Sequence, residues 1–216
     1  MSQSTSALIF DMDGVLTDSE PIINAAAVAM FQELGVTVRS DDFLPFVGAG
    51  EDRYIGGVAE LHGVAIDLPA AKRRTYELYL GMVPSRLAAF PGAVELVRAC
   101  RAHSLRVAVA SSADLVKVAA NLHQIGLPIE FWDAVVSGEQ VARKKPAPDI
   151  FLAAAQALGL APGACVVVED ALNGVEAARA AHMRCVAVAQ TFPAARLRAA
   201  DLVRDSIAQV RLEDLL

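Results

Sequence analysis

The chain has few cysteines and no long apolar run. Its three cysteines are an odd number and form no CxxC pair, so we expect buried free thiols and no disulfide framework. No apolar stretch approaches the roughly 18–20 residues that cross a bilayer. The polar N-terminus lacks the basic and apolar regions of a secretory signal. These absences predict a cytoplasmic protein with no membrane partner.

Positive charge is also scarce. The 19 lysines and arginines are scattered and outnumbered by 25 aspartates and glutamates, which argues against a nucleic-acid partner. Hydrophobic residues make up 55% of the 216 positions, so the chain can bury a large core and general disorder is excluded. We expect a monomer with one good-sized domain, or a core domain that carries a smaller insertion.

Short apolar runs alternate with helical patterns along most of the chain. Runs of four to six residues suit the strands of a parallel sheet that is buried on both faces, and they occur at 7–10, 106–110, 133–137, 165–169 and 184–189. Amphipathic helical patterns lie between them at 114–125, 148–160 and 173–183. This alternation predicts an α/β fold with an open, Rossmann-like parallel sheet.

One region breaks the alternation. Residues 20–87 contain helix-like sequence patterns and no clear strand. We therefore expect a core domain formed by 1–19 and 88–216, with 20–87 inserted after the first strand as a helical domain.

A pair of aspartates follows the first predicted strand. Asp11 and Asp13 share one side if the strand persists that far, and Gly14 then permits a tight turn. In open α/β sheets the carboxyl ends of the strands form the ligand crevice. A calcium loop starting at Asp11 is excluded, because its glycine and glutamate positions hold Leu16 and Ile22.

Other segment ends carry complementary groups. They are the hydroxyls of Ser111 and Ser112, the ammonium groups of Lys144 and Lys145, and the acids Glu169 and Asp170. Four carboxylates converging on one crevice would repel each other, and Mg²⁺ would relieve that repulsion. A lysine beside them could neutralise a phosphoryl oxygen during transfer. Ser112 has an equally good alternative role at the start of the following helix.

Four motifs together resemble a known family. The stretches "DMDGVLTDSE", "ASSAD", "KKPAPDIF" and "VVVEDALNGVEAA" are similar to the signature motifs of the haloacid dehalogenase (HAD) superfamily, in its order and spacing. The resemblance covers nearly the whole chain and is to the β-phosphoglucomutase/phosphatase-like branch, which has a Rossmann-like core and a helical cap. The cap segment "FVGAGEDRYIGGVAE" also resembles the HAD domain of a plant chloroplast protein.

The resemblance implies a role for each motif residue. Asp11 would attack phosphorus and form an aspartyl-phosphate, and Asp13 would be the general acid and then the base. Ser111 would bond the phosphoryl group, helped by backbone amides near Met12 and Ser112. Lys145 would brace Asp11 and the phosphate.

The family's metal is Mg²⁺. The resemblance places it on Asp11, the Asp13 carbonyl and Asp170, with Glu169 in or beside the first shell. Aspartate at position 13 points to phosphoryl transfer, since carbon–halogen cleavage needs no proton for the leaving group.

The cap favours a phosphatase over a mutase. The mutase pattern has a lysine and an arginine where this chain has Val47 and Glu51, and a histidine in the neighbourhood of residues 20–24, where none occurs. We expect Mg²⁺-dependent hydrolysis of a small phosphorylated metabolite such as a sugar phosphate, with Gly48, Glu51 and Arg53 as cap contacts to the substrate. A hexose-phosphate mutase and a non-catalytic phospho-ligand-binding module remain alternatives.

Overall fold

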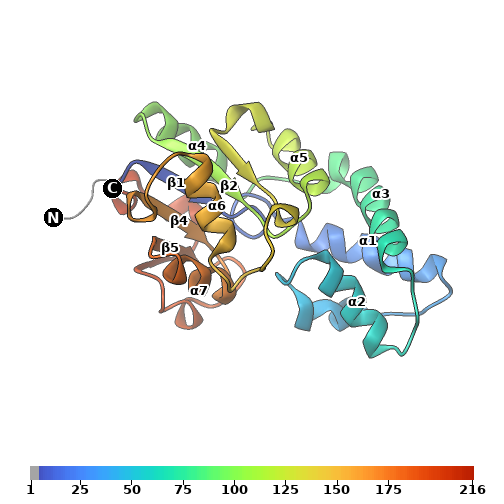
Figure 1. Cartoon of the computed structure of the whole chain (residues 1–216). Helices are drawn as coiled ribbons and strands as arrows, with labels where there is room; N and C mark the ends of the chain where they lie inside the picture. Colours follow the sequence, from blue (N-terminus) through green and yellow to red (C-terminus); the bar gives the residue numbers. More distant parts are fainter. Residues whose placement is uncertain (1–4) are drawn as a thin grey trace.

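The computed structural model describes residues 5–216 and places six strands in one sheet (Figure 1). Neighbouring strands are parallel throughout, in the order β3-β2-β1-β4-β5-β6. The strands are β1 (Ala7–Phe10), β2 (Arg106–Ala110), β3 (Ala134–Val136), β4 (Cys165–Glu169), β5 (Arg184–Val188) and β6 (Leu202–Arg204). The predicted Rossmann-like α/β fold is therefore confirmed.

Helices connect the strands. They are α1 (Glu20–Glu33), α2 (Glu51–Leu61), α3 (Leu68–Arg86), α4 (Ala93–Ala102), α5 (Leu115–Gln124), α6 (Asp149–Ala157) and α7 (Leu172–Ala180). Short 3₁₀ helices add Ser40–Phe46, Ile129–Phe131, Gly138–Gln140, Pro162–Ala164, Ala194–Arg196, Ile207–Gln209 and Leu212–Asp214. Helices α5, α6 and α7 overlap the three helical patterns predicted between the strands.

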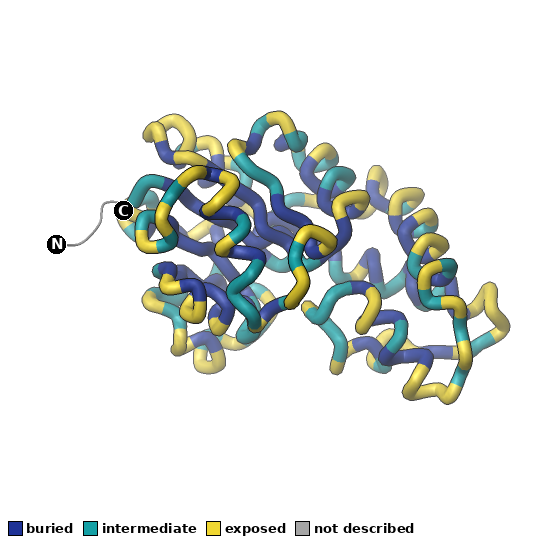
Figure 2. The backbone as a smooth tube through the Cα atoms, viewed as in Figure 1, coloured by how far each residue is buried: buried dark blue, intermediate teal, exposed yellow. Residues whose placement is uncertain are grey.

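The sheet is buried on both faces (Figure 2). Along β1, Leu8 and Phe10 join the core beneath α4 and α5, whereas Ala7 and Ile9 join the core beneath α6 and α7. Each fully buried leucine or phenylalanine contributes about 1.5–3 kcal/mol relative to an exposed one. This double burial explains why the strands read as continuous apolar runs, and it holds the strand ends in fixed positions.

The helices between β1 and α4 form a separate helical lobe, seen on the right of Figure 1. Helices α1, α2 and α3 pack around a hydrophobic core of their own. A buried hydrogen bond from Tyr79 Oη on α3 to Asn121 Oδ1 on α5, 2.6 Å long, joins this lobe to the sheet domain. We call the lobe the cap; its exact bounds, 20–87, stay a prediction.

Two elements were missed by the sequence prediction. Strand β6 is only three residues long and half-buried at the sheet edge, so it gives no apolar run. Helix α4 follows Gly92 directly, in a part of the predicted core domain for which the sequence analysis named no element. The three cysteines are free and buried, as predicted.

Within residues 5–216, no helix combines the length and apolar character needed to span a bilayer. The cytoplasmic location and the monomeric state remain predictions.

Candidate active site

Asp11 lies just beyond the carboxyl end of β1. Its backbone N–H still bonds the carbonyl of Val168 on β4 at 2.9 Å, so the strand register continues to this residue. Because β1 lies between β2 and β4, the residues that end these three strands meet at one edge of the sheet. Asp11 is only 6% exposed.

Lys145 joins two of the buried acids. Its Nζ lies 2.5 Å from Asp11 Oδ1 and 2.6 Å from Glu169 Oε1. Burial lowers the pKa of Lys145, but attraction to the two carboxylates outweighs it, and the pKa is raised above its ordinary value. Lys145 is therefore a fixed cation beside Asp11.

Asp11, Glu169 and Asp170 form a buried acidic cluster, with one carboxylate oxygen of each within 4.8 Å of the others. Burial, reinforced by Glu169 and Asp13 against the opposing Lys145, raises the pKa of Asp11 to about 7. Burial and the neighbouring Glu169 and Asp11 also raise the pKa of Asp170 well above its usual value. Three ionised carboxylates would exceed the charge that one lysine balances, which is why these pKa values rise on burial.

Glu169 differs from the other two acids. Its Oε2 accepts hydrogen bonds from the backbone N–H groups of Asp170 and Ala171, both at 2.7 Å, while its Oε1 accepts from Lys145. Both oxygens are therefore occupied by donors. This arrangement suits a residue that fixes Lys145 and the turn after β4, more than it suits a metal ligand.

Two glycines leave room for these carboxylates. A Cβ at Gly14, whose φ is +80°, would lie 2.0 Å from Asp170 Oδ2. A Cβ at Gly174 would lie 1.7 Å from Glu169 Oε1. Any side chain at either position would displace a member of the acidic cluster.

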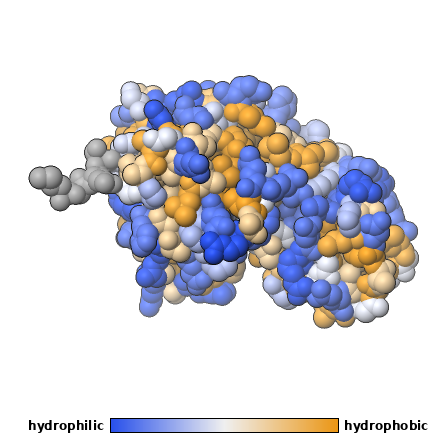
Figure 3. Space-filling view, viewed as in Figure 1, coloured by the Kyte–Doolittle hydropathy of each residue, from blue (hydrophilic) through white to orange (hydrophobic). Residues whose placement is uncertain are grey.

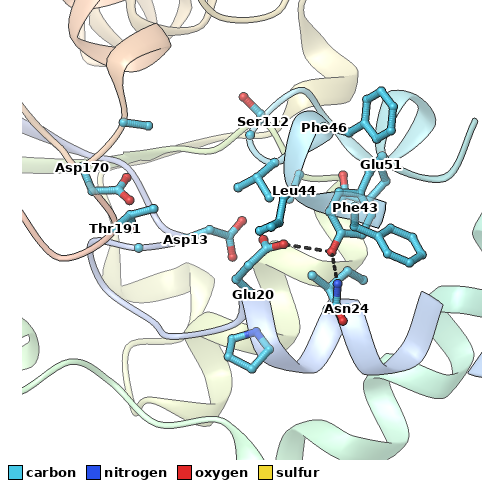
Figure 4. A pocket seen from close by; sticks show the side chains of 18 of the residues that line it. Asp13, Glu20, Asn24, Phe43, Leu44, Phe46, Glu51, Ser112, Asp170 and Thr191 are labelled. Atoms are coloured by element: carbon cyan, nitrogen blue, oxygen red, sulfur yellow. Dashed lines mark hydrogen bonds between the residues drawn. The ribbon is translucent and has the colours of Figure 1, made fainter. Parts of the chain in front are cut away.

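Asp13 points into a cavity and is held from two sides. Ser19 donates a short hydrogen bond to Asp13 Oδ1, and Lys117 Nζ lies 3.1 Å from Asp13 Oδ2 (Figure 4 shows Asp13 in the cavity). The same Nζ lies 3.5 Å from Oε1 of Glu51 on the cap. The Lys117 side chain is 4% exposed. This lysine links Asp13 to the cap.

The two serines after β2 have different surroundings. Ser111 Oγ accepts from the N–H of Ala113 at 3.2 Å, and its own N–H bonds the carbonyl of Val136. Ser112 Oγ is buried and has no hydrogen-bond partner in the described chain, yet Ser112 lines the cavity. Its hydroxyl oxygen is thus unpaired within the described residues but not accessible from the cavity. Met12 is fully buried, and a phosphate contact through nearby backbone amides stays a prediction.

Lys144 stands next to Lys145 in the sequence but does not line the cavity. Its Nζ donates a short hydrogen bond to the carbonyl of Gly138, and the side chain is half-buried. Lys144 therefore supports the loop before α6.

The cavity, of about 1080 Å³, is lined by both the sheet domain and the cap. The surface is notched where the two lobes meet (Figure 3). Asp13 and Asp170 face it from one side, and Phe43, Leu44 and Glu51 face it from the other (Figure 4).

Three cap residues were predicted to contact substrate, and they differ in position. Gly48 and Glu51 line the cavity, and the Gly48 carbonyl accepts from Asn173 Nδ2 at 3.2 Å, which is a direct contact between cap and core. Arg53 does not line it: its guanidinium pairs with Glu60 at 2.7 Å and lies 4.9 Å from the centre of the Phe46 ring. A substrate contact from Arg53 therefore has no support.

Residues 5–182 match the family model described as "Hydrolase: haloacid dehalogenase-like hydrolase". The chain belongs to this family.

Three relatives place the chain within the HAD family. It is 50% identical over 216 residues to Protein SUPPRESSOR OF QUENCHING 1, chloroplastic, of Arabidopsis thaliana, covering 98% of this chain but only 20% of that protein. It is 32% identical to Hexitol phosphatase B of Escherichia coli (strain K12), covering 97% and 96%. The CbbY crystal structure from Rhodobacter sphaeroides with xylulose-(1,5)bisphosphate superposes with a TM-score of 0.90 at 27% identity, covering 98% and 99%. The predicted family and branch are confirmed.

The site of this HAD chain holds one residue that the sequence analysis missed. Lys117 sits in an amphipathic helix whose other buried residues include Val118 and Leu122. A lysine on the buried face of this helix could have indicated a site residue, because a lysine side chain rarely stays buried without a partner.

Proposed function

We propose that the chain is a Mg²⁺-dependent phosphatase that hydrolyses a small phosphorylated metabolite, of the sugar-phosphate class, through an aspartyl-phosphate on Asp11. The observation that carries the proposal is the Asp11 carboxylate, held 2.5 Å from the Lys145 ammonium beside Asp170 and near a separately anchored Asp13. Family membership supports hydrolysis, and the name of the E. coli relative supports a phosphorylated polyol or sugar.

The acidic cluster fits a magnesium ion. Its donors are carboxylate oxygens, which hard divalent cations prefer, and burial has raised the pKa of both Asp11 and Asp170. A cation would lower both pKa values and relieve the repulsion. Asp11 and Asp170 would hold the ion, with the Asp13 carbonyl as a further ligand, and Glu169 would orient Lys145. The bound ion would supply charge neutralisation at the phosphoryl oxygens.

The side chains then divide the reaction into two steps. An Asp11 carboxylate oxygen attacks phosphorus while the bond to the leaving oxygen breaks, and Asp13 gives that oxygen its proton. Water next attacks the phosphorus of the aspartyl-phosphate while Asp13 accepts a proton, and the bond from Asp11 to phosphorus breaks. Lys145 neutralises charge near the phosphoryl group in both steps, and the Ser111 hydroxyl and backbone amides near Met12 and Ser112 donate to its oxygens.

Hydrolysis is favoured over a mutase reaction by the cap. A mutase must hold a second phosphate while the first is transferred, and that needs a cation on the cap side. Arg53 faces Glu60 instead of the cavity, and Val47 and Glu51 lack positive charge. Water is then the acceptor that the site can serve.

The test is phosphate release from a panel of phosphorylated sugars, polyols and p-nitrophenyl phosphate, with Mg²⁺ present. We expect activity that disappears with a chelator and falls by at least about a thousandfold in Asp11→Asn, because the nucleophile is removed. Asp52→Asn is the matched control, since the Asp52 side chain is 67% exposed on the cap surface.

Two outcomes would contradict the proposal. Turnover that survives Asp11→Asn would exclude the covalent mechanism. A requirement for a bisphosphate activator, with slow phosphate release, would instead identify a mutase.

A further inference from the structure

We propose that the cavity selects phosphate esters whose leaving alcohol is uncharged and rich in hydroxyl groups, and that it disfavours a leaving group with a second phosphate or a carboxylate. This rests on the phosphatase function proposed above and adds the charge class of the substrate. The distribution of charge around the cavity carries the inference.

Both cations on the cavity wall, among the described residues, are already paired twice. Lys145 contacts Asp11 and Glu169 at 2.5 and 2.6 Å, and Lys117 contacts Asp13 and Glu51 at 3.1 and 3.5 Å. The transferring phosphoryl group meets Lys145. No further lysine or arginine of the described chain lines the cavity to pair with a second anion.

The cap side of the cavity is acidic or apolar. Glu20, Asp41 and Glu51 line it together with the rings of Phe43 and Phe46. A second anion placed there would lose hydration without gaining a counter-ion, and it would lie near carboxylates of the same sign. Burial raises the pKa of Glu20 and Glu51, which lessens their charge but gives an anion no attraction.

The same wall offers acceptors for hydroxyl groups. Tyr54 Oη donates to Glu20 Oε1 at 2.9 Å and accepts from Asn24 Nδ2 at 3.1 Å, as the dashed lines of Figure 4 show. The other Glu20 oxygen has no hydrogen bond within the described residues and lies on the cavity side of this network. Polyol hydroxyls are donors that such carboxylate oxygens bind well.

The experiment compares pairs of substrates that differ in the charge of the leaving group. Sorbitol 6-phosphate and 6-phosphogluconate share a carbon chain and differ by a hydroxymethyl or carboxylate end. Fructose 1-phosphate and fructose 1,6-bisphosphate differ by a second phosphate. We expect kcat/KM to favour the member of each pair with the uncharged leaving group by at least about tenfold, a factor that one desolvated like charge readily produces.

Substitutions on the cap side of the cavity then test whether its carboxylates cause this substrate preference. Glu20→Gln and Glu51→Gln each remove one negative charge and should narrow the sorbitol 6-phosphate to 6-phosphogluconate ratio by about threefold or more. Glu20→Gln leaves the Lys117 ion pairs intact, so it keeps the test valid if Glu51→Gln folds poorly. Glu60→Gln is the control, because the Glu60 side chain is 68% exposed and pairs with Arg53 outside the cavity. It should leave the ratio unchanged.

Each result decides the inference. The inference would be overturned by equal kcat/KM for the two members of each pair, or by a sorbitol 6-phosphate to 6-phosphogluconate ratio that neither Glu20→Gln nor Glu51→Gln changes. Hydrolysis of p-nitrophenyl phosphate would still support the phosphatase in either case. No phosphate release from any ester, p-nitrophenyl phosphate included, would overturn both proposals.

Discussion

Replacing Lys117 with methionine removes the buried charge that joins Asp13 to the cap. The ammonium lies 3.1 Å from Asp13 Oδ2 and 3.5 Å from Glu51 Oε1, and the Glu51 side chain is 7% exposed. Methionine has nearly the same length and no charge, so packing is largely kept. The variant therefore isolates the electrostatic role of the lysine.

The expected loss of stability follows from these distances. At an effective dielectric constant of about 20, each attraction amounts to about 5 kcal/mol, which the desolvation of the lysine offsets in part. Breaking a buried pair leaves an unpaired charge and costs about 3–5 kcal/mol. Burial already raises the pKa of Glu51, and uptake of a proton by Glu51 would reduce the loss. We expect about 2–4 kcal/mol, or a fall in Tm of about 5–15 °C.

Catalysis should fall as well. Asp13 would keep only its bond to Ser19, and a misplaced acid/base group loses much of the roughly 100–10,000-fold that such a group contributes. We expect kcat to fall by about 10–100-fold while KM changes less than about threefold, because the Lys117 ammonium is already paired with Asp13 and Glu51.

The assay pairs thermal unfolding with steady-state kinetics. Arg53→Met is the matched control, since it breaks an exposed ion pair worth about 0.2–1 kcal/mol. The double variant Lys117→Met with Glu51→Leu should regain part of the stability, because it removes a stranded carboxylate, but it should not regain kcat. A Lys117→Met protein with unchanged Tm and unchanged kcat would refute the reasoning.

Two further predictions concern the acidic cluster. Gly174→Ala should abolish most activity, because the new Cβ would lie 1.7 Å from Glu169 Oε1. The control Gly81→Ala has no atom within 4 Å of its new Cβ, so it should keep full activity and gain about 0.4–1 kcal/mol of stability. Equal activity of the two variants would contradict this prediction. The pKa of Asp11 is raised from 3.8 to about 7, so between these values the folded protein holds a proton that the unfolded chain has lost. The metal-free protein should therefore lose stability, on the order of 4 kcal/mol in total, as pH rises from about 4 to about 7. Mg²⁺ should then raise Tm more at about pH 8 than at about pH 5, and a Tm that Mg²⁺ leaves unchanged at both would exclude binding at this cluster.

Residues that end strands were predictable because a parallel sheet gathers them. Apolar runs gave the strands, and the order in which β1 is flanked by β2 and β4 brings Asp11, Ser111 and Asp170 to one edge. Lys145 follows a longer connection, and only its motif indicated its place. The contact of 2.5 Å with Asp11 depends on the path of the loop before α6, which no local pattern of residues specifies.

Residues that face the cap were less predictable because they depend on how two lobes pack. Lys117 and Glu51 come from helices more than fifty positions apart, and their contact exists only in the assembled structure. Arg53 stands two residues from Glu51 in the sequence, yet α2 turns it to the surface, since side chains two apart on a helix do not share a face.

The two buried lysines serve different aspartates, and this division bears on the reaction. Lys145 holds Asp11, which must be an anion to attack phosphorus, whereas Lys117 and Ser19 fix Asp13, which must exchange a proton with the leaving oxygen and then with water. Separate anchors keep Asp11 beside Lys145 while the acid/base group is oriented toward the cavity. Both lysines are already paired with these aspartates, so the site has positive charge for one phosphoryl group. The charge of a bound metal ion would also lie beside Asp11, and not on the cap side of the cavity.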